Sequence, residues 1–496
     1  MRNLDPFRQS FAPLHKSGRK ADPFSQIMGG HLQADELRDL ELIQCLTKMR
    51  QKNLSPKYYN LSGLSIGFRL PDGRRVYLPI EHAQRHLALI GRTRAGKTNE
   101  MMWLFESLAR QNNCSLIVID RGDLISGLLS RMGEHWEDVI LVRISDTEFP
   151  VGINLLNLAR FQPERIIGEF TRLLNLISSE KLTDPMTHLL RRTLRALLCR
   201  PDATLLDIEP FLFDADFRAG VLRQVRDPEL RYFWQHRYPQ QEKSFRGTAQ
   251  AIITRLDLII GDPSSRYLLC QPETLIPIQE LVNGNRNLIL LLDLNSRDEV
   301  SGMVGELIAR VFLIILHSLA LSRSFHHPKP IFLLADEVQT YLEPASLSEI
   351  LARGAKYGIH LVCAFQYLAQ LGDLWQALEG NMGSLFCFTL GADDARKVAK
   401  SFPGTDPQEF VALPRFQMLA RVNDDEGTYC FKVRTLPLEP IYGDSSSRII
   451  SNSRQRFARP RAEVEAEFQR RRESFFQKAD MEREPESFVE GYDPIA

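Results

Sequence analysis

The chain has 496 residues, with 62 Lys plus Arg and 62 Asp plus Glu, so its formal net charge is zero. Hydrophobic residues make up 44% and charged residues 25%, the proportions of an ordinary globular protein. These values exclude a wholly disordered chain, a collagen-like chain and a protein that attracts polyanions through its total charge. The length indicates about two to four domains. Any affinity for nucleic acid must therefore come from a local basic surface or from several subunits together.

The cysteines and the apolar runs indicate the cellular compartment in which the protein is expected. The seven cysteines are odd in number, and no two of them have a CxxC spacing, so buried thiols in a reducing compartment are expected. The first 20 residues are polar and basic and lack the apolar core of a secretory signal. The longest apolar run, Val311–Leu321, is shorter than the roughly 20 residues of a membrane span and predicts a buried helix. We therefore expect a cytoplasmic protein with no membrane span of its own.

The first part of the chain changes from polar to patterned. Residues 1–60 form a polar N-terminal segment, in which residues 34–52 favour a short helix. A hairpin is predicted next, because Ile66, Phe68 and Leu70 alternate before the turn residues of 71–73. Three short apolar strands follow at residues 86–90, 116–119 and 139–144, with helical spacing after the first. Short apolar strands that alternate with helices predict a mostly parallel sheet with helices on both faces.

Helical periodicity dominates the middle of the chain, and strand patterns then return. We expect an all-helical insertion over 155–275, which divides an α/β core into residues 61–154 and 276–437. Strands are predicted at 288–294, 331–335, 361–364 and 385–390, followed by a hairpin at 418–433. Residues 438–496 are rich in charge and are interpreted as a tail, of which 454–478 favour a solvated, salt-bridged helix.

Residues 91–98 (GRTRAGKT) match the phosphate-loop pattern G-x-x-x-x-G-K-[ST]. Glycines let consecutive main-chain N–H groups surround phosphate oxygens, and the helix that follows carries partial positive charge at its N-terminus. Lys97 would reach the β- and γ-phosphates, and the Thr98 hydroxyl would bind Mg²⁺. The expected nucleotide-binding residues are Gly91, Arg92, Thr93, Arg94, Ala95, Gly96, Lys97, Thr98, Asn99 and Asp120. For Asp120, at the end of the second core strand, a turn or helix cap is an equal alternative.

A second motif is the apolar strand that ends in Asp336 and Glu337. Beside a phosphate loop, the first acid would bind Mg²⁺ and the second would deprotonate the attacking water. Strands that end in two acids are common on their own, so the interpretation depends on the phosphate loop. Gln366, just after the next strand, is placed to sense the γ-phosphate. These residues predict ATP and Mg²⁺ as cofactors.

Together these segments resemble the HerA/FtsK branch of P-loop ATPases, with the greatest likeness to coupling ATPases of conjugation and type IV secretion of the TraD/TraG kind. The resemblance covers residues 80–440 and includes the phosphate loop, the segment IDRGDL at 119–124 and INLL at 153–156. It continues with the strand that ends in Asp336 and Glu337, the block KYGI at 356–359 with Gln366, and the segment around 380–395. The motifs have the same order and similar spacing as in that branch.

The resemblance implies a RecA-like core that assembles as a hexameric ring, with ATP between subunits and DNA in the central channel. It implies DNA translocation driven by ATP hydrolysis, with a basic residue of the neighbouring subunit stabilising the transition state. Arg353 or Lys356 would supply that charge, because the arginine of the family's pattern falls on Ala355 here. Arg94 also departs from the pattern, which has glycine at that position.

The resemblance and the departures from it lead to three candidate functions. The first is a DNA-translocating motor that works with a relaxosome or secretion apparatus and is peripheral at the inner membrane through its partners. The second is a HerA-like motor that feeds a nuclease in repair or defence. The third is an ATP-gated scaffold or assembly factor with low turnover, which Arg94 and Ala355 would explain.

Overall fold

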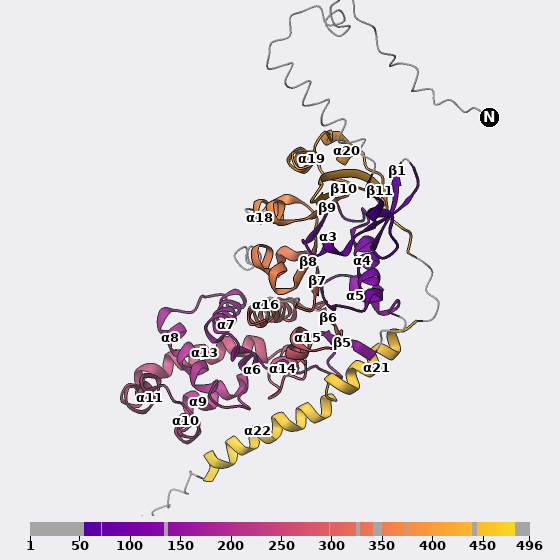
Figure 1. The fold of residues 1–496 in the computed structure, drawn as a ribbon. Coiled ribbons are helices and arrows are strands. Elements are labelled where there is room, and N and C mark those ends of the chain that lie inside the picture. Colours follow the sequence, from indigo (N-terminus) through magenta and orange to yellow (C-terminus); the bar gives the residue numbers. More distant parts are fainter. Residues whose placement is uncertain are drawn as a thin grey trace, which may run out of the picture. The chain divides into compact units, whose positions relative to one another are not determined.

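In the computed structural model, the described residues are 54–70, 72–132, 137–296, 298–323, 328–340, 350–372, 374–438 and 444–481, with side chains described as far as 473. The helix expected over 34–52 and most of the polar segment 1–60 lie outside these residues. Figure 1 shows the arrangement of the helices and strands.

The core is one mixed sheet, which has eleven strands in the described part of the chain. Its order is β2-β1-β11-β10-β9-β3-β8-β7-β4-β6-β5. The seven strands from β9 to β5 are parallel to one another, and β10, β11, β1 and β2 extend the sheet as antiparallel pairs. The strands are β1 (Leu64–Leu70), β2 (Arg75–Leu78), β3 (Leu87–Ile90), β4 (Ser115–Asp120), β5 (Val139–Arg143), β6 (Ile289–Asp293), β7 (Ile331–Asp336), β8 (Ile359–Phe365), β9 (Ser384–Cys387), β10 (Gln417–Asp424) and β11 (Gly427–Arg434).

Each face of the sheet packs against helices. The side chains of α4 (Lys97–Gln111), α5 (Leu124–Leu129) and Ile449 share one apolar cluster with one face of the sheet. The other face packs against α16 (Glu299–Leu321), α18 (Leu374–Asn381), α19 (Ala392–Ala399) and α20 (Pro407–Val411). The predicted mostly parallel sheet with helices on both faces is confirmed. A short helix, α3 (Ile80–Ala83), leads from the first hairpin into β3.

An all-helical region is inserted after β5, and it continues as far as Asn283, beyond the expected boundary at 275. Asn154 starts it: its buried side chain caps the first helix and also donates hydrogen bonds of 2.8 Å to the carbonyls of Ala203 and Pro272. Its helices are α6 (Leu155–Ala159), α7 (Pro163–Ile177), α8 (Asp184–Leu197), α9 (Ile208–Phe213), α10 (Ala215–Leu222), α11 (Pro228–Tyr232), a π-helical turn (Phe233–Arg237), α12 (Tyr238–Gln240), α13 (Glu242–Ile260), α14 (Pro263–Leu269) and α15 (Ile278–Asn283).

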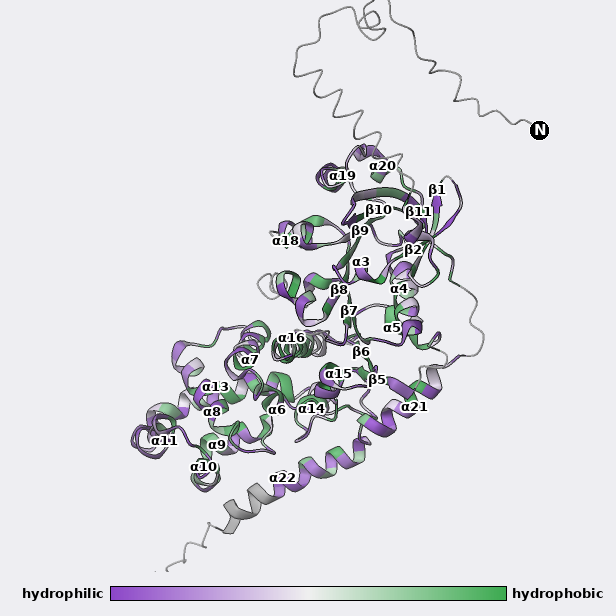
Figure 2. Cartoon of the chain, in the orientation of Figure 1, coloured by the Kyte–Doolittle hydropathy of each residue, from purple (hydrophilic) through white to green (hydrophobic). Residues whose placement is uncertain are grey.

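Helix α16 joins this region to the sheet. Its apolar side chains belong to a single cluster that contains one face of the sheet and most of the inserted helices, and it packs along α7. Figure 2 shows α16 as a mostly hydrophobic helix between the strands and the insertion. Among the described helices it alone has the length and composition of a membrane span, but 72% of its most apolar window is buried inside the protein. A core helix has the same properties.

Residues 438–496, which the charge pattern indicates to be a tail, contain two helices, α21 (Ser446–Phe457) and α22 (Arg461–Met481). Helix α21 packs on β5, where the Ser453 hydroxyl accepts a hydrogen bond of 2.8 Å from Leu141 N. Helix α22 lies against the insertion through Phe468, whose ring stacks on Tyr267. Although α22 is mostly hydrophilic (Figure 2), its few apolar side chains fix it to the protein.

Candidate active site

The phosphate loop connects the end of β3 to the start of α4, and its main chain is held by the neighbouring strands. Gly91 N donates to Phe365 O (3.3 Å) and Arg92 N donates to Thr389 O (2.9 Å). A Cβ atom at Gly91 would lie 2.6 Å from the Cβ of Phe388, so only glycine fits there. Gly96 has φ of +125°, a conformation that residues with a side chain rarely adopt. Both glycines of the pattern are therefore required by the geometry of the loop.

Lys97 is buried, with 8% of its surface exposed, and its ammonium group points into the loop. Its Nζ donates to Gly91 O (2.7 Å) and to Arg92 O (3.3 Å). Burial lowers the pKa of Lys97, and the carboxylates of Asp336 and Glu337 act against that shift. The N-terminus of α4 has no side-chain cap, so its first N–H groups remain available to an anion. The loop and the acid pair are thus close enough to interact.

Asp336 and Glu337 lie where β7 ends. Burial, together with the nearby Asp120 and Glu337, raises the pKa of Asp336 to about 6, although Lys97 acts against the shift. Glu337 has φ of +56°, which is uncommon for a residue with a side chain. Its carboxylate accepts a hydrogen bond of 2.7 Å from the Gln339 side chain. Strained backbone of this kind is frequent at functional sites.

Gln366 connects the two motifs. Strand β8 lies between β3 and β7 in the sheet, so its C-terminal end places Gln366 between the phosphate loop and the acid pair. The Gln366 side chain accepts a hydrogen bond from the Thr93 hydroxyl (3.1 Å) and donates one to the Glu337 carboxylate. A change at any of these three side chains therefore alters the surroundings of the other two.

The remaining predicted loop residues divide into two groups. Arg92, Thr93 and Arg94 are exposed, whereas Ala95 is buried and Thr98 is half-buried at the start of α4. Arg94 has φ of +63°, which explains why glycine suits this position, and its side chain is exposed. The Thr98 hydroxyl and the Asp336 carboxylate are oxygen ligands of the kind that Mg²⁺ prefers.

Asp120 and Asn99 have structural partners. The Asp120 carboxylate accepts hydrogen bonds from Gly122 N (2.9 Å) and Ile125 N (3.1 Å), so it fixes the turn after β4. It also lies near enough to Asp336 to raise its pKa. The Asn99 side chain donates to Leu436 O (2.9 Å) and links α4 to the segment after β11. Of these two residues, Asp120 alone contributes charge to the acid pair.

Arg353 and Lys356 lie before the start of β8, at the opposite end of that strand from Gln366. Lys356 is in the 3₁₀ turn Gly354–Tyr357, and Arg353 precedes it directly, both before β8 begins. The seven residues of β8 span roughly 20 Å at about 3.3 Å per residue, which separates these side chains from Gln366. Both are exposed. Neither belongs to the site of its own chain, so a role for them requires a neighbouring subunit.

Two aromatic residues beside the loop have no signal in the sequence. Phe388 and Phe416 both contact Gly96: a Cβ atom there would lie 3.1 Å from each ring. Phe416 has φ of +63°, and its N–H donates to Ala95 O (2.9 Å). Its ring is 37% exposed, and the Arg415 guanidinium lies 4.4 Å from its centre. No motif singles out these residues, because their position depends on how β9 and β10 flank β3.

A cavity of about 360 Å³ opens beside the loop, lined by Arg92, Thr93, Gln366, Tyr367, Gly391 and Asp394. Of these, Gly391 lies in the segment around 380–395 that carries part of the family resemblance, and so does Asp394. Its carboxylate accepts a hydrogen bond from Leu368 N (3.3 Å), which holds the loop after β8. The cavity thus extends the site from the phosphate loop towards α19.

The sheet order, the phosphate loop and the adjacent acid pair give the chain the fold and the nucleotide-binding motifs of a P-loop ATPase. Residues 64–199 match the family described as the central domain of helicase HerA. Residues 330–402 match the family described as the TraM recognition site of TraD and TraG. No curated protein matches the sequence of this chain. Within its class, the chain is similar to conjugative coupling proteins.

Solved structures show the same fold. The plasmid coupling protein TrwB in complex with ADP and Mg²⁺ is 16% identical and superposes with a TM-score of 0.53, covering 80% of this chain and 93% of that one. TrwB with the ATP analogue ADPNP is 17% identical, with a TM-score of 0.52 and coverage of 81% and 93%. VirB4 of Thermoanaerobacter pseudethanolicus is 16% identical, with a TM-score of 0.50 and coverage of 76% and 98%. These likenesses show a shared fold.

Proposed function

We propose that this chain is a ring-forming ATPase that hydrolyses Mg·ATP to move DNA during conjugation or type IV secretion. The observation that supports this most is the meeting of Lys97, Gln366 and Glu337 at one edge of the sheet. Lys97 would bind the β- and γ-phosphates, and Thr98 and Asp336 would hold Mg²⁺. Glu337 would take a proton from the attacking water, and Gln366 would link that carboxylate to the loop.

The likeness to the plasmid coupling protein TrwB and the match to the TraD/TraG segment support a role as a coupling protein. The match to the HerA central domain supports the second candidate, a motor paired with a nuclease. Co-purification with a nuclease would favour that second candidate. The third candidate, a low-turnover scaffold, rests on Arg94, whose side chain is exposed, and on Ala355.

ATP hydrolysis by the purified protein, with and without double-stranded DNA, tests the mechanism. Lys97→Ala removes the charge that contacts the phosphates and is expected to lower turnover at least about 100-fold. Glu337→Gln keeps the shape but removes the base, which is worth about 10² to 10⁴ in rate. Glu81→Gln, at an exposed residue of α3, is the matched control. Intact hydrolysis in either site variant would refute the mechanism.

The role of a neighbouring subunit needs a separate experiment. Because Arg353 and Lys356 lie at the opposite end of β8 from Gln366, we propose that one of them completes the site of the next subunit. When an inactive Arg353→Ala or Lys356→Ala protein is mixed with Glu337→Gln protein, some subunit interfaces would then contain a wild-type Glu337 from one subunit and the wild-type basic residue from the other. Activity is expected to return on mixing for the residue that acts in trans. If mixing restores activity for neither, the proposed ring interface is wrong.

A further inference from the structure

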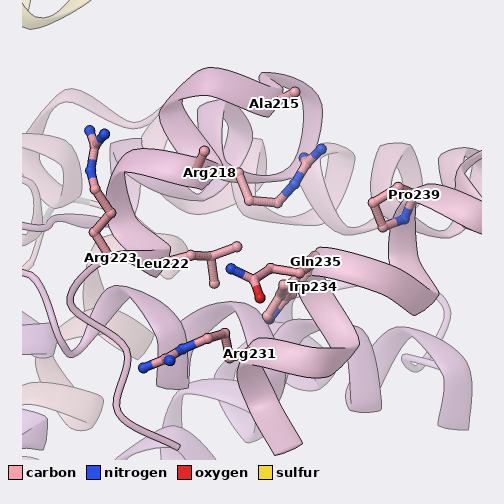
Figure 3. Close-up of a pocket in the computed structure, with 9 residues that line it drawn as sticks. Ala215, Arg218, Leu222, Arg223, Arg231, Trp234, Gln235 and Pro239 are labelled. Carbon is pink, nitrogen blue, oxygen red and sulfur yellow. The ribbon is translucent and has the colours of Figure 1, made fainter. Parts of the chain in front are cut away.

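The inserted helices contain a pocket of about 440 Å³ that is remote from the nucleotide site. On one side it is lined by Arg218 and Leu222 of α10 and by Arg223, which follows that helix. Arg231 of α11 and Trp234 of the π-helical turn line the other side (Figure 3). Its nine lining residues include three arginines and no acid. The pocket is therefore basic, with apolar surface between the charges.

The arginines retain capacity for an anion. Arg218, only 5% exposed, donates to the carbonyls of Phe211 and Leu212 (both 3.1 Å), so its charge is held by main-chain oxygens. Arg231 likewise donates to Val225 O. Arg223 is exposed at the rim. Guanidinium groups have five donors each, and these contacts use only some of them. Carboxylates match the remaining donors in geometry and charge.

A second observation points to a ligand. Trp234 is 1% exposed, and its indole N–H finds no hydrogen-bond acceptor in the described part of the chain. A buried donor without a partner costs free energy that an acceptor from a ligand would recover. Trp234 lies in the π-helical turn Phe233–Arg237, and such turns are frequent at functional sites. The pocket thus offers a buried donor, an apolar wall and several cationic groups.

The chain itself contains a segment of complementary character. Residues 482–496 carry one arginine, Arg483, and five carboxylates, at Glu482, Glu484, Glu486, Glu490 and Asp493. Phe488 and Tyr492 stand among these acids. The segment therefore combines carboxylates for the arginines with aromatic side chains for the apolar wall.

The path of α22 brings this segment within reach. Arg471 of α22 donates to Asp207 Oδ2 (3.5 Å) and to Asp202 O (3.1 Å), beside the start of α9. Helix α9 packs on α10, which forms one wall of the pocket. The helix continues for ten residues beyond Arg471, or about 15 Å. The 15 residues that follow span up to about 50 Å when extended, which is more than enough to return to α10.

We propose that the pocket between α10 and the π-helical turn binds the chain's own acidic segment 482–496. The arginines bind its carboxylates, and Leu222 and Trp234 receive one of its aromatic side chains. This contact would occupy the outer surface of the insertion and would be released when another acidic ligand or a change in salt displaces it. The proposal does not depend on ATP hydrolysis, so it stands or falls separately from the proposed function.

Photo-crosslinking in the full-length chain tests the proposal. With p-benzoylphenylalanine in place of Phe488, irradiation is expected to give adducts within residues 215–240, which mass spectrometry of the digest identifies. Arg223→Glu should lower the adduct yield about fivefold, because it removes an ion pair and adds repulsion. Arg246→Glu, an equal charge reversal on α13 away from the pocket, should leave the yield unchanged. Adducts confined to other parts of the protein would overturn the proposal.

Two further measurements guard against a misfolded variant and a different occupant. Neutralising Glu484, Glu486 and Glu490 to glutamine leaves the pocket intact and should lower the yield as much as Arg223→Glu does. A yield that neither variant lowers would overturn the proposal. In the neutralised chain, a fluorescent 20-mer of single-stranded DNA should bind equally well with Arg223 or with Glu at that position. Weaker binding of the Glu form would assign the pocket to nucleic-acid phosphates and would also overturn the proposal.

Discussion

Replacing Asp336 by asparagine should stabilise the nucleotide-free protein while it weakens Mg²⁺ binding. The Asp336 carboxyl is half-buried at the end of β7 near Asp120 and Glu337, and these surroundings raise its pKa from 3.8 to about 6. The folded protein therefore holds an ionised carboxylate at neutral pH at a cost in free energy. Asparagine has nearly the same shape and carries no charge, so it removes that cost.

The size and pH dependence of the effect follow from the pKa. A difference of about 2.2 between about 6 and 3.8 corresponds to roughly 3 kcal/mol, at 1.36 kcal/mol for each pH unit. Because the folded-state pKa is the higher one, the cost is fully present above about pH 6. It decreases as the pH falls from 6 to 3.8 and is absent below that range. Asp336→Asn should therefore gain up to about 3 kcal/mol at pH 8 and almost nothing near pH 3.8.

Urea unfolding of the wild-type and Asp336→Asn proteins between pH 4 and pH 8 measures this difference. Asp393→Asn, at an exposed carboxylate on α19, is the control and should show no comparable gain. Adding Mg·ATP at pH 8 should reverse the order, because only the wild-type protein retains the carboxylate that holds the metal. If Asp336→Asn is less stable than wild type at pH 8 without nucleotide, the assigned environment of Asp336 is wrong.

Three other substitutions test separate features. Asn154→Ala removes a helix cap and the donor to two buried carbonyls, so it should lower the free energy of unfolding in urea by about 3 kcal/mol. Asp227→Ala, which removes a helix cap alone, should lower it by about 1 kcal/mol. Equal losses would contradict this reasoning. Arg94→Gly removes the strain of a left-handed backbone conformation but increases the conformational entropy of the unfolded chain. The free energy of unfolding should therefore change by less than about 0.5 kcal/mol, and ATP hydrolysis should persist. Phe468→Ala should cost about 3 kcal/mol and increase amide exchange in α22; unchanged exchange would show that the ring does not hold that helix.

The sequence is sufficient for the features that depend on local pattern. The loop at 91–98 has a short, specific signal, and its presence gives meaning to the strand that ends in Asp336, so the two together predict that they meet. Strand and helix periodicity likewise predicts a parallel sheet interrupted by helices. The strand order is not predictable in this way, because β8 enters between β3 and β7 through contacts that are distant in sequence. That order is what places Gln366 between the two motifs.

Charge obscures the packing of the helices near the end of the chain. In α22, charged residues outnumber the apolar residues, so the pattern indicates a solvated tail. Val464 and Phe468, four residues apart, nevertheless make a narrow apolar stripe that is buried in the structure. Arg94 is similarly difficult, because the sequence does not show whether its side chain turns towards the loop or away from it. Packing partners and main-chain conformation decide both questions.

The connection between α21 and α22 has a mechanical consequence. Arg459 N donates to Pro150 O (3.3 Å) and Arg461 N donates to Glu148 O (2.9 Å), at the point where the chain leaves the sheet for the insertion. The chain therefore passes between the sheet and the insertion at this place twice, once at residues 148–150 and once at residues 459–461. Swinging of the insertion about residues 148–154 would have to pull these two stretches of chain apart. The segment between α21 and α22 thus stiffens the connection between the sheet and the insertion.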